Sequence, residues 1–365
     1  MRAVVFTSPR EPVQVSSVGL DPPGPGEVTV AITAAGVCHS DLHVRRGDWA
    51  VPAPLVMGHE GAGVITETGP GVRDLAEGDH VVLSWVAACG QCRYCLAGHP
   101  ARCKVAATVV APGGVLMDGT SRLSLRGQRI SHYLGVSSFA ERTVVPASGA
   151  IKIRDDAPLD VVALIGCAVA TGMGAVANTA GVEPGATVAV IGCGGVGLSV
   201  VQGARLAGAS RIVAIDVRPE KTALAARLGA TDQANASMND PVAAVRDLVP
   251  DGVDYAFDAI GLTSTTSQAI AMLGLGGAAV IVGLPPDGAT VSFEPLALAE
   301  SDQRILGSNY GSVRPATDIP ALVDRFMAGE LELDALVSAR LPLESAAAAL
   351  DDLESGRALR TLLIP

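Results

Sequence analysis

The sequence is poor in aromatic side chains and in charge, above all in positive charge. Phe, Trp and Tyr make up 3% of the 365 residues, and charged residues 17%. The cores must therefore pack from Val, Ala, Leu and Ile, and 42 glycines indicate many tight turns, a composition typical of α/β folds. Lys and Arg number 26 against 37 Asp and Glu, a net charge of −11, which argues against a nucleic-acid surface.

The sequence also has no long apolar run near its N-terminus. The segment from Met1 to Pro9 contains no apolar run long enough for a signal peptide. We therefore expect a cytoplasmic protein with no membrane partner. The uncharged stretch 186–204 is as long as a membrane span, but its glycines fit a buried strand and turn better. Seven cysteines in such a chain indicate metal ligands or core thiols rather than disulfides.

A length of 365 residues predicts two domains. Up to about Val145, short Val-containing runs alternate with Gly and Pro, which predicts a mostly β domain with loop insertions. From about Val169, short apolar runs alternate with Ala- and Leu-rich segments, the pattern of βαβ units that build a parallel sheet. The strands expected in this sheet are 187–191, 211–215, 253–258 and 278–282.

A glycine-rich turn follows the first of these strands. Gly192, Gly194 and Gly197 form G-x-G-x-x-G between strand 187–191 and a helical run over 198–207, the context that a dinucleotide fold requires. Asp216 follows at the end of the next strand, where a carboxylate accepts both ribose hydroxyls and repels a 2′-phosphate. These residues predict NAD in preference to NADP. A methyltransferase, which also binds an adenosyl ribose through an acid, is the alternative.

Four cysteines are clustered in one loop with the spacing C-x2-C-x2-C-x7-C. They predict a structural zinc bound by four thiolates, with an iron–sulfur cluster as the alternative that spacing alone leaves open. The four are Cys89, Cys92, Cys95 and Cys103.

A second group of potential ligands mixes sulfur and nitrogen. Cys38 precedes Ser40 and His43, and His59 stands beside Glu60 in Gly-His-Glu. Cys and His with an open fourth position are typical of catalytic zinc. An isolated histidine such as His80, His99 or His132 is more often structural.

The segment that starts Gly58-His59-Glu60 and runs to Val72 resembles the zinc-containing alcohol dehydrogenase signature G-H-E-x2-G-x5-G-x2-V at every fixed position. The family is the medium-chain dehydrogenases/reductases. The resemblance runs almost end to end, including 117–122 and 355–361, and is strongest to the long-form branch of liver-type and glutathione-dependent formaldehyde dehydrogenases.

The resemblance implies that Cys38, His59 and Cys167 bind the catalytic zinc, leaving its fourth position to water or substrate oxygen. Glu60 would approach the zinc during ligand exchange, and Asp41 would orient the His59 ring. The resemblance also implies a proton relay. In it, Ser40 takes the substrate proton, which passes through the ribose 2′-hydroxyl to His43 and then to solvent.

The resemblance places further residues around the cofactor and the substrate. His39 stands where a pyrophosphate contact, often Arg, is expected, so phosphate binding there would be weaker or pH-dependent. The cofactor-binding residues implied are His39, Thr171, Gly192, Gly194, Gly195, Val196, Gly197, Asp216, Lys221 and Arg360. The substrate-pocket residues implied are Trp49, Trp85, Tyr133, Leu134, Leu284 and Asn309.

The resemblance implies a GroES-like, mostly β catalytic domain in two segments, 1–168 and 310–365, and a doubly wound parallel-sheet Rossmann domain over 169–309, with the chemistry in a cleft between them. We expect a reversible dehydrogenase that uses NAD and two zinc ions per chain on a small primary alcohol or aldehyde, aromatic or of medium length. A thiol-adduct formaldehyde dehydrogenase and a non-catalytic NAD-binding protein are the alternatives. A homodimer or homotetramer is expected from an exposed edge strand near 278–282.

Overall fold

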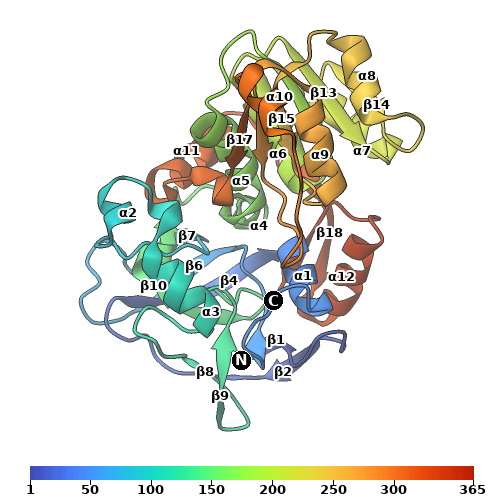
Figure 1. Ribbon diagram of the computed structural model, residues 1–365. Helices are drawn as coiled ribbons and strands as arrows, with labels where there is room; N and C mark the ends of the chain where they lie inside the picture. Colours follow the sequence, from blue (N-terminus) through green and yellow to red (C-terminus); the bar gives the residue numbers. More distant parts are fainter. The chain divides into compact units, whose positions relative to one another are not determined.

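The computed structural model describes residues 1–365, and its contacts divide the chain into two compact units. The first consists of two segments, Met1–Cys167 and Arg314–Pro365, and the second is the continuous segment Ala168–Val313. The first unit is mostly β, and the second alternates strands and helices along the chain (Figure 1).

The first unit contains a six-stranded sheet that includes the N-terminal strand of the chain. Its short strands pair antiparallel except for β5 and β9, which run parallel. In spatial order the strands are β2 (Gln14–Ser17), β1 (Arg2–Phe6), β5 (Leu55–Val56), β9 (Gln128–His132), β8 (Leu123–Leu125) and β3 (Gly19–Leu20).

A seven-stranded sheet forms the centre of the same unit. Its longest strand, β4, lies between two neighbouring strands, and most of its residues are buried. In order the strands are β11 (Ala150–Lys152), β7 (His80–Leu83), β6 (Gly61–Thr68), β4 (Glu27–Gly36), β19 (Arg360–Ile364) and β18 (Val337–Pro342), with β10 (Arg142–Pro146) also paired to β4. The register pairs Leu362 with Gly36 and Leu363 with Ala35, so Arg360 lies close to the loop that follows β4.

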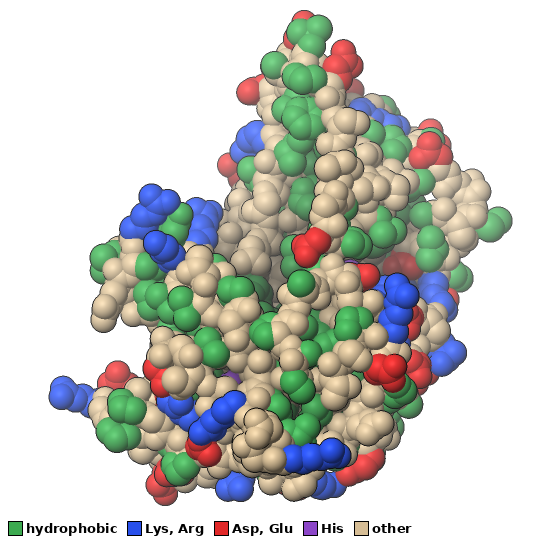
Figure 2. All heavy atoms as spheres, turned by 60° about the horizontal axis from the view of Figure 1, so that its bottom comes forward, with side chains coloured by type: hydrophobic (Ala, Val, Ile, Leu, Met, Phe, Trp, Pro, Cys, Tyr) green, Lys and Arg blue, Asp and Glu red, His purple; other side chains and the backbone are tan.

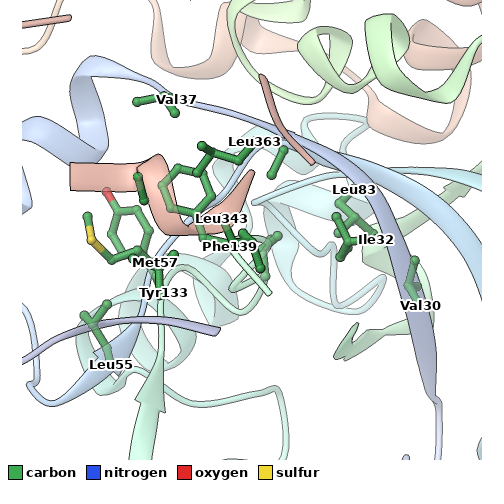
Figure 3. Packing of buried hydrophobic residues seen from close by; sticks show 14 of the residues in the cluster. Val30, Ile32, Val37, Leu55, Met57, Leu83, Tyr133, Phe139, Leu343 and Leu363 are labelled. Atoms are coloured by element: carbon green, nitrogen blue, oxygen red, sulfur yellow. The ribbon is translucent and has the colours of Figure 1, made fainter. Parts of the chain in front are cut away.

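Apolar side chains from both sheets and from the C-terminal segment share one core. Figure 3 shows Phe139 and Leu343 together in it, with Tyr133 beside Met57. The helices of this unit are α1 (His39–Arg46), α2 (Arg93–Leu96), α3 (Ala111–Gly113), α4 (Leu159–Val162), α11 (Pro315–Met327) and α12 (Ala346–Glu354). Short 3-10 or π turns are η1 (Pro100–Arg102), η2 (Ala106–Val110), η3 (Ala147–Gly149), η4 (Ala163–Gly166), η7 (Asp334–Leu336) and η8 (Leu343–Ser345).

The second unit is built on a six-stranded sheet in which every pair is parallel. In order the strands are β14 (Asp232–Asn235), β13 (Arg211–Asp216), β12 (Thr187–Ile191), β15 (Val253–Asp258), β16 (Leu273–Ile281) and β17 (Arg304–Gly307). Its helical segments are α5 (Ala168–Gly174), η5 (Ala175–Ala180), α6 (Gly195–Leu206), α7 (Pro219–Leu228), α8 (Pro241–Leu248), α9 (Thr263–Ala271), α10 (Pro295–Glu300) and η6 (Asn309–Ser312). The strand order reverses at β12, the position where such sheets bind ligands.

The strands that the sequence predicted for this sheet need three corrections. Strand β16 begins at Leu273, ahead of the expected 278–282, and strands β14 and β17 were not expected. The expected edge strand at 278–282 was wrong, because β17 pairs with β16 along Ala278–Ile281 and is itself the edge. Both missed strands are four residues long and only partly buried, so neither carries an apolar run that would mark a strand.

No single helix is long and apolar enough to cross a membrane. The helical segments Leu159–Gly166 and Ala168–Ala180, bent by 51° relative to each other, are together long and apolar enough, judged by length and composition only. The stretch 186–204 contains strand β12 and most of helix α6. On the face in Figure 2, charged side chains lie in small groups separated by apolar and other polar ones.

Candidate active site and metal centres

The start of helix α1 holds Cys38 in a fixed position. Cys38 is the residue before the helix, and its backbone N–H donates to Oδ2 of Asp41 at 3.0 Å, half of a capping box. Asp41 is completely buried, so its carboxylate must be satisfied by such contacts. The helix cap therefore fixes both the Cys38 thiol and an acid beside it.

The other carboxylate oxygen of Asp41 fixes the His59 ring. Its Oδ1 lies 3.2 Å from Nδ1 of His59. Because an ionised carboxylate only accepts, Nδ1 carries the proton of that hydrogen bond. The edge of the Tyr133 ring packs against the imidazole, with centroids 5.5 Å apart. Nε2 of His59 is buried and has no hydrogen-bond partner.

Cys167 completes the group that surrounds this nitrogen. The ligand atoms of Cys38, His59 and Cys167 lie within 4.8 Å of one another, and all three residues are buried. Two thiols and a buried, unpartnered imidazole nitrogen fit a tetrahedral zinc that keeps one position open. These three residues are the ones that the family resemblance implied as ligands of a catalytic zinc.

The charges of this group are strongly interdependent. A hydrogen bond from the Cys167 thiol lowers the pKa of Cys38 well below its ordinary value, against the opposing effect of burial. The same hydrogen bond, together with burial, raises the pKa of Cys167. Burial lowers the pKa of His59, but the Asp41 carboxylate and Cys38 together raise it, to about 10. Zinc ligands must be deprotonated, so zinc binding to these residues would release protons.

A buried ion pair lies next to the three ligands. Nη2 of Arg360 donates to Oε2 of Glu60, and the two side chains are 3% and 0% exposed. Burial raises the pKa of Glu60 to about 7, although the charge of Arg360 opposes the rise. Arg360 is thus placed against Glu60 in the interior, and its expected contact with a cofactor pyrophosphate stays a prediction.

The predicted proton-relay residues are both on helix α1. Ser40 Oγ lies 4.0 Å from Cys38 Sγ, and the Tyr133 hydroxyl donates to the Ser40 carbonyl at 3.1 Å. His43 is one turn further along, so the two side chains share a helix face. His39, the expected phosphate contact, is exposed on the same helix.

The four-cysteine loop brings all its sulfur atoms together. The four Sγ atoms lie within 4.8 Å of one another, and Cys92 and Cys95 are 3.6 Å apart. Backbone N–H groups donate to the sulfur atoms, from Cys89 to Cys103 at 3.3 Å and from Cys92 to Cys89 at 3.4 Å. Such donors stabilise thiolates, and the backbone N–H groups of Cys95 and Lys104 lower the pKa of Cys92 to about 6. The four sulfur atoms together fit a structural zinc.

The glycine-rich turn of the second unit joins β12 to α6. Gly192 donates its N–H to Ile215 at 2.8 Å, which ties the turn to the neighbouring strand β13. A Cβ on Gly197 would lie 1.7 Å from the Gly192 carbonyl oxygen, so only glycine fits there. Gly194 precedes the helix, and Gly195 and Val196 form its first turn, where free N–H groups can face a phosphate.

Asp216 ends strand β13 beside this turn. Its carboxylate accepts the N–H groups of Cys193 at 2.8 Å and Arg218 at 3.0 Å. The Arg218 guanidinium lies 3.5 Å from Glu220, in an exposed pair. The carboxylate is therefore held at the tip of the strand, where the sequence placed a ribose partner.

The remaining predicted residues are divided between the units. Trp85 and Leu134 are partly buried against the core of the first unit. In the second unit, Thr171 is buried in α5, Lys221 is on α7, and Asn309 begins η6. Leu284 is 47% exposed. Their roles toward cofactor and substrate stay predictions.

Sequence reasoning missed three contacts around the candidate site. It treated Glu60 and Arg360 separately, although they pair across 300 positions of sequence. It gave Asp48 no partner, whereas Asp48 contacts His43 at 2.8 Å. It placed Tyr133 only as a pocket wall. Only the Asp48 contact is local enough that a helix-end motif could have indicated it.

Comparison with known proteins identifies related families over most of the chain. The family model of the alcohol dehydrogenase GroES-like domain matches residues 24–155, and that of the zinc-binding dehydrogenases matches residues 195–328. These matches confirm the predicted fold class, a GroES-like domain combined with a Rossmann-type domain.

Full-length relatives extend the match. An S-(hydroxymethyl)glutathione dehydrogenase of Escherichia coli O1:K1 is 39% identical over 368 residues, 99% of each chain. Benzyl alcohol dehydrogenase of Acinetobacter calcoaceticus superposes with a TM-score of 0.94 at 33% identity, covering 100% of this chain and 98% of that one. An NADP-bound zinc-binding dehydrogenase of Sinorhizobium meliloti 1021 gives 0.82 at 29%, covering 100% and 99%. The chain therefore belongs to the zinc-containing alcohol dehydrogenases of the medium-chain dehydrogenase/reductase family.

Proposed function

We propose that this enzyme oxidises a primary alcohol to an aldehyde, reversibly, at the site formed by Cys38, His59 and Cys167. The observation that carries this proposal is the buried Nε2 of His59, which has no hydrogen-bond partner and lies among two thiols. A nitrogen in that position costs free energy unless a ligand satisfies it. A zinc ion held by these three residues would satisfy it, and Ser40 lies beside the Cys38 thiol, where it can bind the substrate hydroxyl.

The reaction balances as alcohol plus NAD⁺ giving aldehyde, NADH and one proton. Zinc, when bound, supplies a Lewis acid for the substrate oxygen, and NAD accepts the hydride with its electron pair. Ser40 accepts the hydroxyl proton of the substrate, and His43 releases it to solvent. Asp41 keeps the His59 ring in the orientation that aims Nε2 at the site.

The substrate we favour is an aromatic or medium-chain alcohol. Trp49, Trp85, Tyr133 and Leu134 supply large apolar surfaces within the first unit, and a relative with the same fold is named for benzyl alcohol. A role of Leu284 and Asn309 toward the substrate stays a prediction from the family resemblance. An apolar pocket of this kind selects for a substrate without charge.

The second candidate is the thiol adduct of formaldehyde, because a 39% identical relative is named for S-(hydroxymethyl)glutathione. Such a substrate carries carboxylates that need cations. Arg45, however, pairs with Asp351 and Glu354 of helix α12, and Arg46 pairs with Glu354. These arginines are already neutralised, so the structure favours the uncharged alcohol.

A substrate panel tests the choice. NADH formation is measured at its absorbance band with benzyl alcohol, medium-chain primary alcohols and S-(hydroxymethyl)glutathione at equal concentrations. The highest kcat/KM is expected with an uncharged alcohol. Turnover with the thiol adduct alone would establish the second candidate instead.

The proposed cofactor preference is NAD over NADP. The Asp216 carboxylate is held by two backbone N–H groups at the end of β13, so it cannot turn away from a 2′-phosphate without breaking both. We expect kcat/KM to be at least tenfold higher with NAD. In Asp216→Ser this ratio should approach one, and an unchanged ratio would show that Asp216 does not face the ribose.

The proposed assembly is a homodimer or homotetramer. Strand β17 is the edge of the sheet, and Leu275 of β16 and Leu296 of α10 are 83% and 61% exposed. Such edges and apolar side chains are usually covered by a partner. Light scattering at micromolar concentration should give twice or four times the chain mass, and a monomer would contradict the proposal.

A further inference from the structure

The end of helix α1 turns back on itself in a way that joins two side chains. Gly47 has φ +81°, a left-handed conformation that suits glycine, and its N–H donates to Val44 at 3.1 Å. The N–H of Asp48 donates to the carbonyl of His43 at 2.9 Å. These two bonds form a Schellman motif, which places the side chains of residues 43 and 48 against each other.

Where this motif usually has an apolar contact, the chain has an imidazole and a carboxylate. Nδ1 of His43 lies 2.8 Å from Oδ2 of Asp48. The Trp49 ring stacks on the imidazole, with centroids 4.4 Å apart and planes inclined by 23°. The side chains of His43 and Asp48 are 16% and 26% exposed, so solvent reaches the pair only partly. The Asp48 carboxylate therefore holds the His43 ring at its edge, and the Trp49 ring holds it on one face.

The contact determines which ring nitrogen can act as a base. An ionised carboxylate accepts hydrogen bonds and donates none, so the proton of neutral His43 must be on Nδ1. Nε2 then carries the lone pair. A relay that takes a proton from the substrate side needs this tautomer, because Nε2 in the other tautomer already holds a proton.

The neighbouring charges of α1 are engaged elsewhere. Asp41 is bound to Cys38 and His59, and Arg45 and Arg46 pair with acids of α12. Asp48 is therefore the acid that the structure assigns to His43.

We propose that Asp48 is a positioning residue that fixes the tautomer and orientation of His43 for proton release, an inference that rests on the proposed function. During alcohol oxidation the proton that leaves the substrate hydroxyl bonds to Nε2 of His43, and the Nδ1 proton stays on the imidazolium facing Asp48. The imidazolium then returns to the starting tautomer by releasing the Nε2 proton to water. Asp48 itself gains no proton, and the hydride goes to NAD⁺.

The test replaces the acceptor by a group of the same shape. In Asp48→Asn the amide can donate to Nδ1, which favours the proton on Nε2. The zinc-loaded wild-type and variant enzymes are compared by ¹⁵N–¹H NMR of the imidazole rings. The chain has only six histidines, and the His43 signal is assigned by its loss in His43→Gln. We expect the Nδ1–H tautomer in the wild type and the Nε2–H tautomer in the variant.

Turnover is measured on the same samples. Since general base catalysis contributes on the order of a hundredfold or more, we expect kcat for alcohol oxidation to fall about tenfold or more in Asp48→Asn, with little change in KM. Asp351→Asn is the matched control, because it removes an ion-paired acid that is 64% exposed and does not contact His43. It should leave tautomer, kcat and zinc content unchanged. Asp48→Ala, which removes the acceptor altogether, serves if the asparagine variant does not fold.

The outcomes separate this inference from the proposed function. An Nε2–H tautomer in the wild type, a tautomer that does not change in Asp48→Asn, or a changed tautomer with unaltered kcat would each overturn the role of Asp48. A wild-type enzyme that forms no NADH from any alcohol would overturn the proposed function, while the NMR result would still report on the contact.

Discussion

Replacing Cys38 by serine should leave a folded enzyme with one zinc in place of two and almost no turnover. The hydroxyl is a hard, poorly ionised ligand, so the three-residue site should lose its metal, while the loop of Cys89 to Cys103 keeps its own. Without a Lewis acid the reaction should slow about a thousandfold or more, roughly 4 kcal/mol of transition-state stabilisation. Elemental analysis and NADH formation measure the two effects.

The same variant separates metal loss from cofactor loss. Gly192, Gly197 and Asp216 belong to the other unit, so NADH binding, followed by its fluorescence, should change little. Cys193→Ser, a cysteine-to-serine change outside both clusters, is the matched control and should retain two zinc ions. Near-normal turnover of Cys38→Ser with a full metal complement would show that Cys38 is not a ligand.

Replacing Arg360 by methionine should destabilise the first unit by about 3–5 kcal/mol, because it leaves the Glu60 carboxylate in the interior without that counter-charge. The change is measured as a lower midpoint of urea unfolding, followed by the fluorescence of Trp49 and Trp85, which both lie in the first unit. Arg340→Met is a suitable control, since Arg340 pairs with Asp160 while 45% exposed, and such pairs contribute about 1 kcal/mol or less.

The double variant Glu60→Gln/Arg360→Met identifies the cause. With both charges removed, most of the lost stability should return, because the cost comes from an unpaired buried charge rather than from lost packing. A double variant no more stable than Arg360→Met would mean that the arginine acts through its packing alone.

The sequence predicted the parts of the protein whose signals are local. The glycine turn, the strands over 187–191 and 253–258 and the four-cysteine loop each lie within a short segment, so spacing and periodicity were sufficient. Strand β17 was missed because four partly exposed residues carry no pattern, and its place is set by pairing with β16.

The candidate site shows the same division between local and distant signals. Cys38, His59 and Cys167 were proposed as zinc ligands from the family resemblance, and the structure brings their ligand atoms together. The pairing of Glu60 with Arg360 had no local signal, because it depends on where β19 enters the sheet. The contact between His43 and Asp48 follows from a helix-end motif that apolar periodicity does not reveal.

The position of β19 has a consequence for the order in which the protein can fold during synthesis. Its five residues pair with β4 and β18, yet they leave the ribosome only after the whole of the second unit. The continuous segment Ala168–Val313 can complete its sheet while translation continues. The first unit can add β19 and β18 to the end of β4 only after that, and such contacts of high sequence separation form slowly. Newly made chains should therefore pass through a stage in which the nucleotide-binding half is structured, while Ala35 and Gly36 at the end of β4 still lack their β19 partners.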